Sequence, residues 1–310
     1  MSIAVYLPSE ASTEDWCRML RDLMPDWEVH PLQKVPDPAA VEYAVVWRPK
    51  TGCMTPFPNL KAIVSIGAGI DHVLADAELP QDVPIIRTVG TDLTQRMKEY
   101  VALHVLRHHR ALPALQVSQA ARKWAPVVVP PASGRRVGVM GLGNLGSAAA
   151  SLLAAIGFDV VGWSRSPKEI AGVTTFAGDG GLAPFLAGTE ILVCLLPLTD
   201  QTRGILNADT FNQLKRGACI INAARGPHLV DEDLIEVLAS GQIEAATLDV
   251  FHIEPLPSDH PFWDNPKITI TPHVASLIDA PTGSRIIARN LRTFAETGTV
   301  ADVADARRGY

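Results

Sequence analysis

The sequence lacks the features that define several classes of protein. It has only four cysteines, Cys17, Cys53, Cys194 and Cys219, with no Cys-x-x-Cys pair and no histidine at zinc-finger spacing. Neither a disulfide framework nor a structural zinc site is therefore expected, and the apolar runs around Cys194 and Cys219 predict buried thiols. No apolar run approaches the ~20 residues that span a bilayer. The first residues have no basic segment before an apolar stretch, so we expect neither a membrane anchor nor a signal peptide.

Positive charge is not in excess either. Lys and Arg number 27 against 33 Asp and Glu, which gives a net charge of −6. A mildly acidic surface disfavours nucleic acid and anionic membranes as partners, although a local basic group still suits a small anionic substrate. With 47% hydrophobic and 19% charged residues the chain is not disordered. At roughly 150 residues per domain, its 310 residues predict about two domains. Since neither a membrane anchor nor a signal peptide is expected, we expect a cytoplasmic protein.

Short β-rich runs alternate with helical patterns in two series, which predicts an α/β protein with doubly wound parallel sheets. In the first series we expect a helix capped by Ser12 and ended by Pro25, and a long helix from Thr94 to Pro113. In the second series Asn207 is expected to cap one helix and Gly241 to end another. The predicted strands are residues 3–7, 43–47, 63–65 and 85–87 in the first series, and 137–140, 160–163, 191–195, 219–222, 245–249 and 268–271 in the second.

Two further segments bear on domain organisation. The long helix predicted from Thr94 and the Pro-rich residues 126–134, which hold no predicted element, together mark the passage into the second domain. The last predicted helix, residues 282–297, follows the second series without a strand partner there. We therefore expect it to return to the first domain.

A glycine motif follows the first strand of the second series. Gly141, Gly143 and Gly146 form Gly-x-Gly-x-x-Gly between an apolar strand and a helical run. In that context the glycines permit a tight turn, close approach of a pyrophosphate and close helix packing, while the helix N-terminus attracts phosphate. The sequence predicts a dinucleotide site here; an ordinary glycine-rich turn is the alternative.

The end of the next strand bears on the choice of cofactor. NAD-binding proteins usually carry Asp or Glu about 20 residues beyond the glycines, but here the strand ends in Ser164-Arg165-Ser166. Two hydroxyls and a guanidinium suit a 2′-phosphate. We therefore expect NADP(H) to be preferred and NAD(H) to remain usable; a solvated surface loop is the alternative.

Three more segments, each after a predicted strand, contain residues suited to acid–base chemistry and anion binding: residues 222–226 with Arg225, residues 248–256 with Glu254, and residues 271–275 with His273. Taken singly, Arg225 suits a surface ion pair, Glu254 a turn, and His273 a loop hydrogen bond. In this order, behind a dinucleotide motif and at strand ends that meet at one edge of a sheet, they favour a catalytic set.

The whole chain resembles the D-isomer-specific 2-hydroxyacid dehydrogenase family. The resemblance rests on the glycine motif, on the segments around Arg225, Glu254 and Pro272-His273, and on the segments Gly67-Ala68-Gly69-Ile70-Asp71, Met97-Lys98-Glu99-Tyr100-Val101, Leu196-Pro197-Leu198-Thr199 and Arg308-Gly309-Tyr310. It implies a substrate-binding, flavodoxin-like domain of residues 1–97 and 275–310 and a dinucleotide-binding Rossmann domain of residues 98–274. It also implies an active site in the cleft between the two domains.

The resemblance also implies residue roles. Arg225 is expected to bind the substrate carboxylate and polarise the carbonyl, His273 to act as acid–base, and Glu254 to orient His273 and favour its protonated form. The N–H groups of Ala68 and Gly69 are expected to bind the substrate carboxylate. The cofactor contacts are expected from Asp249, at the nicotinamide carboxamide, and from Asn144, Leu145, Leu196, Pro197, Thr202, Ala223 and Ala224.

Within the family the chain is most similar to a branch that reduces glyoxylate to glycolate and hydroxypyruvate to D-glycerate. Trp47 matches a substrate-site position of that branch, although a core tryptophan is the alternative, and the residues after His273 lack the aromatic side chain of many D-lactate enzymes. A homodimer is implied by the family. The alternatives are a phosphoglycerate or broad 2-oxoacid dehydrogenase, or a nucleotide-sensing, corepressor-like protein without catalysis.

Other histidines invite interpretation. His104 and His108, spaced i, i+4, have no third ligand beside them, so no metal site is expected. His228 and His252 flank the active segments, and the sequence leaves their roles open.

Overall fold

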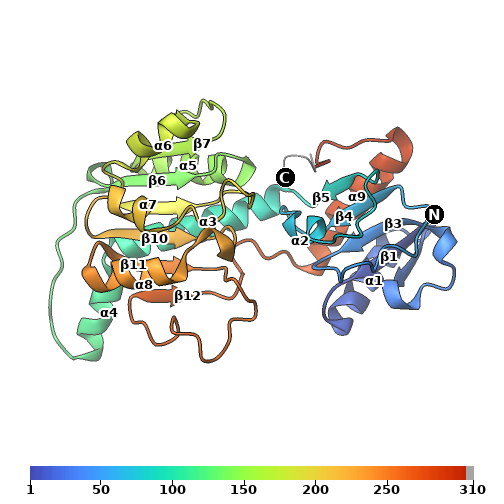
Figure 1. Cartoon of the computed structure of the whole chain (residues 1–310), viewed down its shortest axis with the longest axis horizontal. Helices are drawn as coiled ribbons and strands as arrows, with labels where there is room; N and C mark the ends of the chain where they lie inside the picture. The colour runs from blue at the N-terminus through green and yellow to red at the C-terminus, as the bar shows by residue number, and fades with distance from the viewer. Residues whose placement is uncertain (305–310) are drawn as a thin grey trace. The chain divides into compact units, whose positions relative to one another are not determined.

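The computed structural model describes residues 1–304 (Figure 1). The chain divides into two compact units: unit 1 comprises residues 1–92 and the segment from Ile278 onward, and unit 2 comprises Leu93–Leu277. The sequence prediction placed these boundaries at residues 97 and 274. The Arg308-Gly309-Tyr310 motif lies outside the described residues.

Unit 1 contains a parallel sheet of five strands within the described residues, in the order β2-β1-β3-β4-β5, which is the flavodoxin-like order. Its last helix, α9, returns to this unit as expected, and Gly283 of α9 lies so close to Trp16 of α1 that a Cβ atom there would be 2.2 Å from the indole. The elements are β1 (Ser2–Tyr6), α1 (Glu10–Leu23), β2 (Glu28–Pro31), β3 (Val41–Val46), β4 (Ala62–Ser65), α2 (Asp71–Leu74), β5 (Ile85–Arg87) and α9 (Ala280–Thr297).

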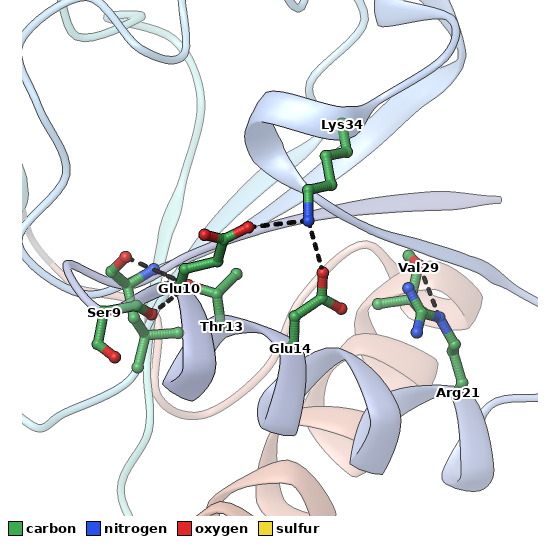
Figure 2. Close-up of polar contacts among 8 residues, drawn as sticks. Ser9, Glu10, Thr13, Glu14, Arg21, Val29 and Lys34 are labelled. Carbon is green, nitrogen blue, oxygen red and sulfur yellow. Dashed lines mark hydrogen bonds and ion pairs between the residues drawn. The ribbon is translucent and has the colours of Figure 1, made fainter.

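Helix α1 begins three residues earlier than the sequence predicted. Ser9, not Ser12, is the N-cap, and its Oγ accepts a hydrogen bond from the Ser12 N–H. Lys34 Nζ binds Glu10 and Glu14 at 2.9 and 3.0 Å, which places a cation between the carboxylates of the first two turns (Figure 2). The prediction was wrong because two serines precede the apolar pattern and only backbone geometry decides which one leaves the helix.

Unit 2 contains a parallel sheet whose described strands run β12-β11-β10-β9-β6-β7-β8, the Rossmann order extended by one strand. The two-domain, doubly wound α/β prediction is therefore confirmed. The strands are β6 (Arg136–Met140), β7 (Asp159–Ser164), β8 (Val173–Ala177), β9 (Ile191–Cys194), β10 (Ala218–Asn222), β11 (Ile243–Leu248) and β12 (Ile268–Ile270). The sequence prediction missed β2 and β8, both edge strands, because their partly exposed residues carry only a weak apolar pattern.

Helices cover both faces of the unit 2 sheet. Alternate strand residues enter two different cores: Leu192 and Cys194 pack with α6, α7 and α8, whereas Ile191 and Val193 pack with α3 and α5. Asn207 caps α7 and Gly241 ends α8 with φ of 72°, as predicted. The helices are α3 (Thr91–His109), α4 (Leu112–Ala120), α5 (Asn144–Ile156), α6 (Asp179–Leu186), α7 (Ala208–Gln213) and α8 (Asp231–Ser240).

The predicted single helix from Thr94 to Pro113 is wrong in detail. It is two helices, α3 and α4, which are separated at Ala111, where φ is 54°. Pro113 lies in the first turn of α4, where a missing N–H costs no helical hydrogen bond.

Cys194 and Cys219 are buried, as predicted. Burial raises the pKa of each thiol to about 12, so both stay protonated near neutral pH. Among residues 1–304 no helix is both long and apolar enough to cross a membrane.

Candidate active site

The glycine motif lies at the switch point of the unit 2 sheet, where β6 is flanked by β7 and β9. Gly141 has φ of 98°, which favours glycine, and a Cβ atom there would lie 2.7 Å from the Leu195 carbonyl oxygen. At Gly146 a Cβ atom would lie 1.7 Å from the Gly141 carbonyl oxygen, so α5 can pack this closely only with glycine.

The N-terminus of α5 fits a pyrophosphate. Gly143 is the N-cap of α5, and a Cβ atom there would have nothing within 4 Å, so its backbone is open to a ligand. The next residues, Asn144 and Leu145, begin a 13-residue helix whose first N–H groups point toward the same end. The tight turn, the open backbone at Gly143 and the helix N-terminus are the features that the predicted dinucleotide site requires.

The end of β7 carries the three residues predicted to distinguish NADP from NAD. Ser164 is buried, and its Oγ donates a hydrogen bond to the Ser166 carbonyl at 2.7 Å, which fixes the turn. Arg165 and Ser166 are exposed at this turn. The turn therefore presents a guanidinium and a hydroxyl, and no carboxylate occurs in residues 162–166.

The segment after β9 is folded by Thr202. Its hydroxyl donates to the Pro197 carbonyl at 2.7 Å and accepts the Thr199 N–H at 2.9 Å, while Leu196 is buried. Thr202, predicted as a cofactor contact, thus has a structural role within this loop.

Arg225 follows β10 in a tightly packed loop. Ala223 and Ala224 before it are buried, and its Nη1 donates to the Ala224 carbonyl at 2.7 Å. A Cβ atom on the adjacent Gly226 would lie 2.0 Å from the carbonyl carbon of Phe251. The Arg225 loop and the loop after β11, which leads to Glu254, are therefore in direct backbone contact.

His228, whose role the sequence left open, connects two of these loops. It is fully buried; its Nε2 lies 3.2 Å from the Pro197 carbonyl and its Nδ1 lies 3.2 Å from the Arg225 N–H. Nδ1 also lies 3.1 Å from the Arg225 carbonyl, so the ring is surrounded by backbone polar groups of the loops after β9 and β10. The sequence analysis did not predict this connecting role. The feature that could have indicated it is the position of His228, three residues after Arg225 in the short 3₁₀ turn Gly226–His228.

His273 and Glu254 form a close pair, although 19 residues separate them. His273 Nδ1 lies 2.8 Å from Glu254 Oε2, and Glu254 Oε1 accepts the Phe251 N–H at 2.9 Å. The carboxylate is largely buried, and the imidazole is about one quarter exposed. Because a carboxylate only accepts, Nδ1 is the nitrogen that donates in this pair.

The order of the sheet explains how the candidate residues come together within unit 2. Strands β9, β10, β11 and β12 are neighbours, and Leu196, Arg225, Glu254 and His273 follow them in turn. The carboxyl ends of these parallel strands share one edge, which is where ligands of such sheets bind. Asp249 is buried at this edge, with its carboxylate bonded to residues 271–275.

Unit 1 positions the other predicted substrate residues after two neighbouring strands: Trp47 directly follows β3, and Ala68 and Gly69 lie in the loop after β4. The Trp47 ring packs on Gly67, where a Cβ atom would lie 2.8 Å from Cζ3, and Trp47 is partly exposed rather than in the core. Ser65 Oγ donates to the Gly69 carbonyl at 2.8 Å and lies 3.0 Å from His72 Nε2. These contacts hold the backbone of the Gly67-Ala68-Gly69 segment.

Four other histidines differ in their surroundings: two are buried, and two lie beside Asp231. His104 and His108 are buried on α3, and burial is the main cause that lowers their pKa values, to about 4 and about 3. His252 donates to the Leu229 carbonyl at 2.9 Å and, like His260, lies 3.5 Å from Asp231. Across residues 1–304 no group of three or more His, Cys, Asp or Glu side chains is placed to hold a metal ion.

Known proteins resemble both the sequence and the structure. Residues 102–275 match the family model "D-isomer specific 2-hydroxyacid dehydrogenase, NAD binding domain". A glyoxylate/hydroxypyruvate reductase A of Serratia proteamaculans is 41% identical, with all of both chains covered.

Two solved structures are similar over nearly their whole length. A family member from Xanthobacter autotrophicus Py2, in complex with NADPH and MES, has a TM-score of 0.94 and 42% identity, covering 100% of this chain and 99% of that one. An NADPH-dependent glyoxylate/hydroxypyruvate reductase from Sinorhizobium meliloti, in complex with NADP and sulfate, has a TM-score of 0.93 and 39% identity with the same coverage. The chain belongs to the D-isomer-specific 2-hydroxyacid dehydrogenase family.

Proposed function

We propose that this protein reduces small 2-oxo acids, glyoxylate to glycolate and hydroxypyruvate to D-glycerate, with NADPH. The observation that carries the proposal is the His273–Glu254 pair at 2.8 Å, which lies at the same sheet edge as Arg225 and the glycine motif. The similar proteins named as glyoxylate/hydroxypyruvate reductases support these substrates.

The residues of unit 2 suit the chemistry of carbonyl reduction. When bound, NADPH supplies a hydride to the carbonyl carbon, and negative charge then develops on the carbonyl oxygen. His273, held through Nδ1 by Glu254, donates the proton from Nε2 to that oxygen. Arg225 binds the carboxylate of the 2-oxo acid and stabilises the developing charge.

Unit 1 is proposed to supply further substrate contacts. The N–H groups of Ala68 and Gly69 bind the substrate carboxylate, and the partly exposed Trp47 ring restricts the length of the substrate. Short 2-oxo acids are therefore expected to be better substrates than long ones.

The preference for NADPH rests on the end of β7. Exposed Arg165 and Ser166 replace the carboxylate that NAD enzymes use at this position. Two similar structures contain NADPH or NADP, which supports the same assignment. Asn144 and Leu145 complete the proposed cofactor contacts, with Leu196, Pro197, Thr202, Ala223 and Ala224 lining the loops beside them. Asp249, which the sequence prediction placed at the nicotinamide carboxamide, is 1% exposed and binds residues 271–275 with both carboxylate oxygens, so it is not part of the proposed cofactor contacts.

A substrate panel tests the reaction. Purified protein is assayed for NADPH oxidation with glyoxylate, hydroxypyruvate, pyruvate and 3-phosphohydroxypyruvate, and again with NADH. We expect the highest kcat/KM with the first two acids and NADPH. Preference for the phosphorylated acid would favour a phosphoglycerate-type enzyme, and no oxidation with any acid would leave the corepressor-like alternative.

Variants test the assigned residues. His273→Gln should lower kcat by about 10²-fold or more because the proton donor is lost, whereas the matched control His30→Gln, in unit 1, should not. Arg165→Ala should raise the KM for NADPH and leave that for NADH unchanged, with Lys168→Ala as control. Normal turnover of His273→Gln would remove His273 from the acid–base role.

We also propose that the protein is a cytoplasmic homodimer. Unit 2 exposes apolar side chains on α3, α4 and the segment that follows; Trp124 is 99% exposed and Val128 96%. Four free cysteines suit a reducing compartment. Light scattering after size exclusion should give twice the chain mass, and Trp124→Glu should shift it toward the monomer.

A further inference from the structure

The carboxylate of Asp249 organises the loop that carries His273. Asp249 directly follows β11 and is 1% exposed. Its Oδ1 accepts the Val274 N–H at 2.9 Å, its Oδ2 accepts the Ala275 N–H at 2.9 Å, and its carbonyl accepts the His273 N–H at 2.8 Å. Three consecutive amides are therefore held by one residue.

This loop needs to be held because His273 is in the left-handed region. Its φ is 55°, a conformation that disfavours a residue with a Cβ atom and persists only where surrounding contacts impose it. The hydrogen bonds from His273, Val274 and Ala275 to Asp249 are contacts of this kind. Any motion of the Asp249 carboxylate would therefore displace the imidazole from Glu254.

A chain of hydroxyl groups reaches the carboxylate from helix α3. Thr271 Oγ1 donates to Asp249 Oδ1 at 2.6 Å, and Tyr100 Oη lies 2.8 Å from Thr271 Oγ1. The Thr271 hydroxyl has one hydrogen, which it gives to the carboxylate, so Tyr100 must be the donor in the second bond. The direction of the chain is thus fixed as Tyr100 to Thr271 to Asp249.

We propose that Tyr100 and Thr271 are positioning residues for His273, acting through Asp249. Tyr100 fixes the rotamer of Thr271, Thr271 fixes the carboxylate, and the carboxylate fixes the strained loop. The inference rests on the proposed role of His273 as acid–base. It assigns the two hydroxyl groups a function that differs from any contact with substrate or cofactor.

The surroundings of Tyr100 suit a permanent donor. Its ring is 8% exposed and lies 4.3 Å, centroid to centroid, from the His104 ring. Burial, and then the charge of Asp249, raise the pKa of Tyr100, so the phenol keeps its hydrogen at all pH values at which an enzyme of this kind is assayed. Chains of this type also strengthen the terminal hydrogen bond.

The experiment compares Thr271→Val, Thr271→Ser and Tyr100→Phe with wild type. Amide exchange at Val274 and Ala275 is followed by NMR, together with kcat and the Kd for NADPH from fluorescence. Thr271→Val should speed exchange at both amides and lower kcat about tenfold, as expected for one lost hydrogen bond to a charged group, with the Kd for NADPH unchanged. Thr271→Ser, which keeps the hydroxyl group, should restore the slow amide exchange and the kcat of wild type.

A matched control separates this role from general stability. Thr247→Val removes another buried hydroxyl that faces α3, since Thr247 Oγ1 lies 2.9 Å from His108 Nε2; this hydroxyl binds His108, whereas that of Thr271 binds Asp249. This control should lower Tm without changing exchange at Val274 and Ala275. Tyr100→Phe should have a smaller effect than Thr271→Val, and none once Thr271 is already Val, because the chain is then broken.

Three outcomes would overturn the inference: unchanged exchange and kcat in Thr271→Val, a rise only in the Kd for NADPH, or additive effects of the two substitutions. If wild type reduces no 2-oxo acid, the proposed function fails. The amide exchange data still decide whether Tyr100 and Thr271 hold the loop.

Discussion

Gly226→Ala tests whether the loops after β10 and β11 are rigidly coupled to each other. The new Cβ atom would lie 2.0 Å from the carbonyl carbon of Phe251 and 2.4 Å from the His252 nitrogen, whereas ordinary contact begins at 3.4 Å. The neighbouring backbone must therefore move by about 1.4 Å. Both obstacles are backbone atoms, so no side-chain rotation relieves the clash.

The consequence for activity follows from what the two loops carry. Arg225 precedes Gly226, and Glu254 follows Phe251 by three residues, so movement of either loop changes the distance between the guanidinium and the His273–Glu254 pair. A misplacement of about 1 Å typically costs about 10²-fold in rate. We expect Gly226→Ala to lower kcat/KM for glyoxylate about 10²-fold and to destabilise the fold by about 1–3 kcal/mol, as overpacking does.

The assay is steady-state NADPH oxidation with glyoxylate, alongside a thermal melt. Gly180→Ala is the matched control, because a Cβ atom at Gly180 of α6 meets nothing within 4 Å; it should keep full activity and stabilise slightly. Wild-type kinetics in Gly226→Ala would show that the loops are not rigidly coupled and would refute the reasoning.

Three further predictions concern other parts of unit 2. Gly146→Ala should weaken NADPH binding at least tenfold in a fluorescence titration, because its Cβ atom would lie 1.7 Å from the Gly141 carbonyl oxygen; unchanged Kd would contradict the proposed dinucleotide site. His228→Ala should destabilise the protein by about 2 kcal/mol or more in denaturant unfolding, since it leaves buried polar groups unpaired, and His228→Gln should recover part of this loss. Burial lowers the pKa values of His104 and His108 in the folded state, so below the unfolded-state pKa of about 6.5 the unfolded chain binds more protons than the folded one. The contribution of these two neutral rings to the free energy of unfolding is complete above a pH of about 6.5. It is lost as the pH falls toward about 4 and about 3, by about 1.4 kcal/mol per pH unit for each ring; urea midpoints that do not fall between pH 7 and pH 5 would contradict this prediction.

The sequence predicted well where one local pattern determines one outcome. Continuous apolar runs gave the buried strands β9 and β10, and Gly241 ended α8 because a helix commonly ends at a residue in the left-handed conformation. The prediction of helix ends failed where more than one residue suits the same position. Ser9 and Ser12 both suit an N-cap, and Pro113 suits both the end of one helix and the start of the next.

Local patterns also could not find His228 or the Tyr100–Thr271–Asp249 chain. Nothing near Tyr100 in the sequence indicates a partner 171 residues later. Tyr100 meets Thr271 only because of the packing of α3 on the sheet and the order of the strands.

The amino-acid sequence by itself determined the class of fold, the glycine turn and the identity of the candidate acid–base, guanidinium and carboxylate groups, because chemistry and backbone permissiveness belong to individual residues. Only the tertiary structure decided that Glu254 meets His273 Nδ1 and that Gly226 lies against Phe251. It also decided that Asp249 holds a loop in a conformation its residues would not adopt alone. The physical reason is that hydrogen bonds and close contacts act over a few ångströms, and strand order in the sheet, not spacing along the chain, sets which groups come within that range.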